Sequence, residues 1–105
     1  MDSDTLTAIA EPNRLRIIEL LRDGGPRPVG EIGAYLRIRQ PQVSKHLRVL
    51  HDAGIVTARP IAQQRVYQLE AAPFSQLESW LDSFHKVWET RLDTLDEYLR
   101  DLQNK

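Results

Sequence analysis

The 105-residue sequence contains no cysteine. This absence excludes disulfide bonds, thiolate metal sites and cysteine nucleophiles, and it suits a reducing cytoplasm. Long hydrophobic runs are also missing, because no apolar stretch approaches the roughly 20 residues that a membrane-spanning helix needs. The N-terminal segment MDSDTLTAIAEP has acidic side chains where a secretory signal has basic ones. We therefore expect a cytoplasmic protein with no export signal and no membrane insertion.

Charge is unevenly distributed along a chain whose formal net charge is −1. Residues 36–51 carry four basic side chains and no acidic one, whereas the segments 1–35 and 74–105 carry net charges of −2 and −3. Such a local positive patch directs one face of a protein towards a polyanion. With 41% apolar and 28% charged residues, the composition predicts a single globular domain over residues 1–105. Its core would be modest, so a second copy would add stability.

Hydrophobic periodicity predicts helices through the first half of the chain. We expect a short helix over residues 5–10 and an amphipathic helix in NRLRIIELLRDGG that ends at its two glycines, with PRP as a linker. The next short helix is VGEIGAYL, in which Gly30 and Gly33 either weaken the helix or allow close approach to a neighbour. A further helix over residues 40–53 has a proline in its first turn and a glycine as its stop.

The helix over residues 40–53 has two chemically different faces. At 100° per residue, one arc carries the side chains expected to pack: Val43, His46, Leu47 and Leu50. The opposite arc is polar and basic: Pro41, Ser44, Lys45 and Arg48, flanked by Gln40 and Gln42. We expect His46, at the edge of the packing face, to be a hydrogen-bonded structural histidine.

Two short β-runs and a long helix complete the chain. IVTARP and RVYQLE predict two strands, and the joining IAQQ favours a loop longer than two residues, because it lacks the Asn-Gly or Gly-Gly of a tight turn. Pro73 is expected to open the final helix. Its apolar residues follow steps of three and four from residue 74 to residue 102, with one stutter at Trp88–Leu92. A stripe about 43 Å long exceeds what one small core can cover.

This order of elements predicts a mainly α (α+β) winged helix–turn–helix. The helix–turn–helix comprises residues 29–54, the two-stranded wing 55–70 and a long C-terminal dimerisation helix 74–103.

The sequence resembles the ArsR/SmtB family of bacterial winged-helix repressors. The matching segments are EPNRLRIIELL, GEIGAYLRIRQPQVSKHLRVLHDAGIV and RVYQLE, and the C-terminal WLDSFHKVWETRLDTLDEYL is similar to the SdpR-like branch. The resemblance implies a homodimer, built from the first and last helices, that represses an inverted-repeat operator in double-stranded DNA. It leaves the inducer or regulatory partner unknown.

Two departures from the family pattern bear on metal sensing and capping. The cysteine motif of the metal sensors is absent, and the last helix has a single histidine, His85. Asp82, His85 and Glu89 are spaced to align as hard metal ligands, but a solvated polar face is the favoured interpretation. We therefore expect no metal and no cofactor. In the family, a serine usually caps the recognition helix, and Arg39 stands at that position here. We expect Arg39 to contact a DNA phosphate in place of capping the helix.

The candidate DNA contacts follow from side-chain chemistry. Glutamine can read adenine, and lysine or arginine can read guanine or contact phosphate, whereas the alternative is an ordinary solvated face. The candidates are Arg39, Gln40, Gln42, Ser44, Lys45, Arg48, Arg59, Gln64 and Arg65. The candidate dimer interface is Leu6, Ile9, Leu77, Leu81, Phe84, Trp88, Leu92, Leu95 and Leu99.

Two other classes of function compete with a DNA-binding repressor. The long aromatic final helix also fits a protein-interaction module, such as an antitoxin or adaptor, built on the same scaffold. An enzyme is disfavoured, because the sequence has no nucleophile–base pair, no glycine-rich phosphate loop and no metal constellation.

Overall fold

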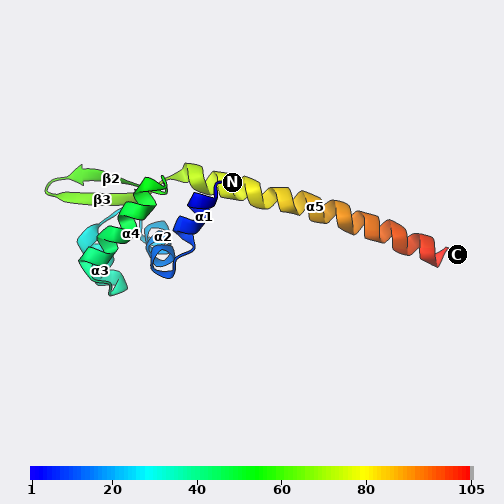
Figure 1. Ribbon diagram of the computed structural model, residues 1–105, viewed down its shortest axis with the longest axis horizontal. Coiled ribbons are helices and arrows are strands. Elements are labelled where there is room, and N and C mark those ends of the chain that lie inside the picture. Colours follow the sequence, from blue (N-terminus) through cyan, green and yellow to red (C-terminus); the bar gives the residue numbers. More distant parts are fainter. Residues whose placement is uncertain (105) are drawn as a thin grey trace. The chain divides into compact units, whose positions relative to one another are not determined.

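The computed structural model describes residues 1–104, which form five helices and three short strands (Figure 1). In chain order these are α1 (Ser3–Ile9), α2 (Pro12–Gly24), β1 (Arg27–Pro28), α3 (Val29–Leu36), α4 (Gln40–Asp52), β2 (Val56–Ile61), β3 (Gln64–Leu69) and α5 (Ala71–Gln103). The chain divides into two compact units, one ending at Phe74 and one beginning at Ser75. The first unit is a winged helix–turn–helix, as predicted, and the second is the greater part of α5.

Local side-chain chemistry sets where the first helices begin and end. The Asp2 carboxylate accepts a hydrogen bond from the Asp4 backbone N–H (3.0 Å), and Glu11 caps α2 by accepting from the Arg14 N–H (2.8 Å). Helix α2 ends at Gly24 and is followed by Gly25, whose φ of 77° is in the left-handed region that glycine adopts without steric cost. These ends lie within a residue or two of the predicted ones.

The core of the first unit lies between α2, α3, α4 and the start of β2. Ile17, Ile32, Leu47, Leu50 and Val56 have no exposed surface. In α4 the buried residues are Val43, Leu47 and Leu50, so the predicted packing face is confirmed. In α2 the buried residues are Ile17, Ile18, Leu20 and Leu21, whereas the apolar side chain of Leu15 is 41% exposed.

The sheet differs from the sequence prediction in two ways. The linker PRP contains a strand, β1, which pairs antiparallel with β3 and gives the order β1-β3-β2. The wing turn has only two residues, because Ile61 pairs with Gln64; the predicted longer loop is wrong. Ala62 makes this turn without glycine by adopting a φ of 55°. Helix α5 begins at Ala71, two residues before Pro73, because the first N–H groups of a helix need no intrahelical acceptor.

The second unit presents a long apolar stripe. Leu81, Trp88, Leu92 and Leu99 are between 46% and 59% exposed, and α5 contains no buried residue. Trp80 and Phe84 pack edge to face with ring centroids 5.0 Å apart. No helix within residues 1–104 is both long and apolar enough to span a membrane.

Candidate nucleic-acid interface

The turn between α3 and α4 is built by one glycine and one left-handed residue. The backbone N–H of Ile38 donates to the Gly33 carbonyl (3.0 Å), and a Cβ on Gly33 would lie 3.0 Å from the Ile38 carbonyl oxygen. Arg37 ends α3 with φ 58° and ψ 43°. Of the two predicted roles for glycine in α3, close approach therefore applies to Gly33. A Cβ on Gly30 would meet nothing within 4 Å.

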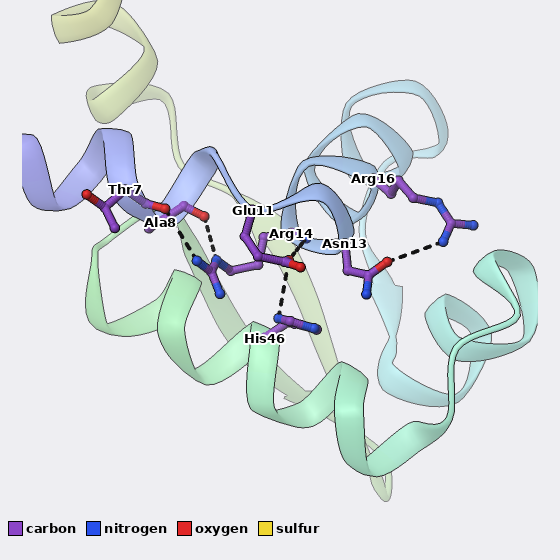
Figure 2. Close-up of polar contacts among 7 residues, drawn as sticks. All are labelled: Thr7, Ala8, Glu11, Asn13, Arg14, Arg16 and His46. Atoms are coloured by element: carbon purple, nitrogen blue, oxygen red, sulfur yellow. Dashed lines mark hydrogen bonds and ion pairs between the residues drawn. The ribbon is translucent and has the colours of Figure 1, made fainter.

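A polar cluster joins α4 to the corner between α1 and α2 (Figure 2). The Arg14 guanidinium donates to the carbonyls of Ala8 (2.6 Å) and Thr7 (3.3 Å), which secures α1 against α2. The carboxylate that caps α2, Glu11, also lies 3.6 Å from His46 Nδ1 on α4. His46 thus has a structural contact, as predicted, but at a distance longer than a hydrogen bond, so the attraction depends on a protonated imidazole. The cluster therefore adds one polar contact to the apolar packing of Val43, Leu47 and Leu50, which holds α4 on the unit.

The outward face of α4 carries exposed side chains with no partner. Gln42, Ser44, Lys45 and Arg48 are all exposed. Within residues 1–104, none of the basic side chains of Arg39, Lys45 and Arg48 makes a hydrogen bond or an ion pair. Helix α4 starts at Gln40 after Arg39, whose side chain makes no capping bond, so the predicted loss of the serine cap is confirmed.

The arginines of α2 behave differently. Arg14 and Arg16 donate to backbone carbonyls, Arg16 to that of Leu36 at 2.8 Å. Arg22 donates to the Asp23 carboxylate (2.8 Å), and this hydrogen bond lowers the pKa of Asp23 below its usual value. Arginines of α2 are thus engaged within the protein, whereas the basic residues of the turn and α4 are free to engage an external anion.

A hollow of about 490 Å³ lies between α4 and the wing, and it brings together some of the predicted contacts. Ser44 and Arg48 line it from α4, and Arg65 and Tyr67 line it from β3. Arg59 pairs with Val66 and Ile61 with Gln64, whereas Ala58 pairs with Tyr67, so the register places Arg59 and Gln64 on the other face of the ribbon. Of the predicted wing contacts, only Arg65 therefore shares a surface with Arg48.

Arg37 contributes to the basic segment of the sequence but is not among the predicted DNA contacts. The structure places it at the exposed turn, where it lines a hollow of about 380 Å³ together with Arg39 and Gln40. Its left-handed backbone costs an ordinary residue about 1–2 kcal/mol, and glycine is the usual solution at such a helix end. The left-handed conformation that sets this residue apart comes from the structure, and the sequence alone gives no sign of it.

The predicted metal-ligand alternative on α5 receives no support. Asp82, His85 and Glu89 lie along one hollow together with Lys86. No three or more His, Asp or Glu side chains within residues 1–104 are grouped so that they could hold a metal ion.

The candidate dimer residues occupy both units. In the first unit, Leu6 and Ile9 of α1 are half-buried. In the second, Leu77 is half-buried, while Leu81, Phe84, Trp88, Leu92, Leu95 and Leu99 are exposed by 45–59%.

A helix–turn–helix whose second helix is buried on one side and basic on the other, followed by a β-ribbon, defines the winged-helix class of DNA-binding proteins. The profile of the arsR family of bacterial regulatory proteins matches residues 11–58. The chain is 42% identical to the HTH-type transcriptional regulator Rv2034 of Mycobacterium tuberculosis over 77 residues, which are 73% of this chain and 71% of that protein. It is 28% identical to the transcriptional repressor SdpR of Bacillus subtilis, over 78% of this chain and 90% of that protein.

Comparison with solved structures indicates the same family. The crystal structure of the ArsR family transcriptional regulator RHA00566 matches with a TM-score of 0.73 and 28% identity, covering 83% of this chain and 89% of that one. The chain belongs to the arsR family of bacterial regulatory proteins. The predicted family and the predicted class, a DNA-binding transcriptional regulator, are confirmed.

Proposed function

We propose that the protein is a homodimeric repressor that binds an inverted-repeat operator in duplex DNA. In this proposal, α4 enters the major groove, where Gln40, Gln42, Lys45 and Arg48 contact base edges or phosphates. The observation that carries the proposal is the division of α4 into a fully buried face and an exposed, unpaired polar and basic face.

The wing provides the second set of contacts. Arg65 lines the same hollow as Arg48, so a phosphate next to the groove occupied by α4 can be held between helix and wing. Arg59 and Gln64, on the other face of the ribbon, are proposed to contact DNA only towards the tip of the hairpin, in the minor groove or on its backbone.

The homodimer is proposed from the exposed apolar stripe of α5. Side chains such as Trp88, Leu92 and Leu95 are about half exposed in the isolated chain, and burying such a stripe against a second copy supplies a hydrophobic driving force. Two subunits would place their recognition helices about one turn, roughly 34 Å, apart on the same face of the duplex. The half-buried Leu6 and Ile9 are proposed to contribute to this interface.

The exposed stripe also favours a second candidate, a protein-interaction module, because another protein could cover the same residues. The unpaired basic face of α4 has no role in that alternative, so we rank it second. We propose no catalytic activity and no cofactor, and we propose the cytoplasm, where the operator lies, as the site of action. The inducer is unidentified.

The experiment that tests the proposal is a pair of double variants. Lys45→Ala with Arg48→Ala should weaken DNA binding by about 2–6 kcal/mol, given about 1–3 kcal/mol for each good base contact. It should leave the unfolding transition unchanged, because both side chains are exposed and unpaired. The matched control, Lys86→Ala with Arg100→Ala, removes the same charge from α5. Fluorescence anisotropy with labelled duplex DNA measures both; equal binding by the two folded variants would refute the role of α4.

A further inference from the structure

A second basic surface lies beside α4, on the turn that precedes it. Its hollow of about 380 Å³ is lined by Gly30 and Ala34 of α3, by Arg37 and Arg39 of the turn, and by Gln40 at the start of α4. Arg37, Arg39 and Gln40 are exposed, and no carboxylate lines the hollow. The surface is therefore positive, and it leads directly to the first residue of α4.

Arg37 is the residue that most needs an explanation. Its φ is 58°, and glycine is the usual residue in this conformation at the end of a helix. Glycine at this position would therefore make the folded state more stable, because it adopts a positive φ without steric cost. Its guanidinium makes no hydrogen bond or ion pair within residues 1–104. A side chain that is kept at a strained backbone position, without a partner in its own chain, indicates a role outside the chain.

The neighbouring residues leave room for a close approach. A Cβ on Gly30 would meet nothing within 4 Å, and both Gly30 and Ala34 are exposed. The first helix of a helix–turn–helix crosses the DNA backbone while the second lies in the major groove. A strand that passes over this side of α3 would meet no bulky side chain before it reached Arg37.

We propose that Arg37 is a further DNA-contacting residue, whose guanidinium binds a phosphodiester of the duplex at the border of the groove that α4 enters. Arg39, in the same hollow, holds the same strand. This inference rests on the proposed DNA binding of α4 and adds a contact that is independent of sequence, because phosphate contacts position a protein without reading bases.

The test uses a 30-base-pair duplex of random sequence, whose binding depends mainly on electrostatics, over a range of salt concentrations. For each subunit that contacts the duplex, Arg37→Gly should weaken binding about five- to tenfold at 0.1 M salt and should lower the slope of log affinity against log salt by about 0.9, which amounts to about 1.8 when both subunits of the proposed dimer are bound. The same variant should unfold at an equal or higher temperature, because glycine relieves the left-handed backbone. Arg37→Lys should restore most of the slope, since it keeps the charge.

A pair of glutamate substitutions on α3 provides a geometric control. Gly30→Glu places a carboxylate in open space beside the proposed phosphate and should weaken binding further than Tyr35→Glu. Tyr35 is 68% exposed and lines a different hollow, together with Arg16 and Glu19 of α2. Titration with inorganic phosphate should leave the melting temperature unchanged, because a single free phosphate lacks the duplex that positions it.

Each outcome decides the inference. An unchanged salt slope for Arg37→Gly, with a lowered slope for Lys45→Ala/Arg48→Ala, would overturn the role of Arg37 and leave the proposed function standing. Stabilisation by inorganic phosphate that is lost in Arg37→Gly would assign the hollow to a small anion in place of DNA. Failure of the wild-type protein to bind any duplex at low salt would overturn both.

Discussion

Gly33 shows how one residue determines the geometry of the DNA-binding turn. It is buried, its carbonyl accepts the N–H of Ile38, and a Cβ at this position would press on a backbone oxygen at 3.0 Å. A backbone atom cannot rotate away as a side chain can. Gly30, one turn earlier in the same helix, has open space around it. Two glycines in one short helix therefore have different physical reasons, and only one is required by packing.

The paired substitutions Gly33→Ala and Gly30→Ala separate these reasons. We expect Gly33→Ala to lower the free energy of unfolding by about 1–3 kcal/mol, because the added methyl group overpacks the turn. Gly30→Ala should raise it by up to about 1 kcal/mol, since alanine is the better helix former. Denaturation with urea, followed by circular dichroism, measures both. Equal shifts in the two variants would show that the close contact at Gly33 is not the cause.

The individual elements differ in how far their sequences determine them. The two faces of α4 follow from a spacing of three and four residues, so the buried Val43, Leu47 and Leu50 could be predicted from the sequence. The strand Arg27–Pro28 could not, because two residues carry no periodicity and the strand exists only through its pairing with β3. The two-residue wing turn could not be predicted either, because Ala62 adopts a left-handed conformation that is usual for glycine or asparagine in turns.

The candidate contacts illustrate the same limit. The exposure of Lys45 and Arg48 could be predicted from helical periodicity, and their charge follows from the residue types. The sharing of one hollow by Arg48 and Arg65 depends on the register of the hairpin, which a turn of unknown length leaves open. The strained backbone of Arg37 could not be predicted, because it depends on the path of the turn between α3 and α4, which only the structure shows.

The stripe on α5 gives a prediction for this element alone. Leu95 and Leu99 are 49% and 46% exposed, and they lie three and four residues from the neighbouring stripe positions. Leu95→Asp or Leu99→Asp should convert the proposed dimer to monomers, because a carboxylate would be buried in an apolar interface. Thr90→Asp, on the far side of the same helix, is the matched control and should leave the dimer intact. Sedimentation velocity distinguishes the species; mutants that sediment as normal dimers would contradict an α5 interface.

At the scale of the whole molecule, the distribution of charge explains how a chain of formal net charge −1 can be a DNA-binding protein. The lysine and arginine side chains between residues 37 and 65 are exposed and unpaired within the described residues 1–104. The arginines of α2 are instead engaged with carbonyls and with Asp23. Acidic residues predominate from residue 74 onward. The distribution of charge therefore favours DNA binding at the basic surface and disfavours it at the acidic remainder of the chain.

The most direct test of the central claim is selection of binding sites from a random duplex pool by the purified, folded protein at moderate salt. A homodimer that reads DNA through α4 should enrich an inverted repeat whose half-sites lie one helical turn apart, about 10 base pairs from centre to centre. Failure to enrich any sequence, by protein whose fold has been verified by circular dichroism, would contradict the account and favour a protein-interaction module.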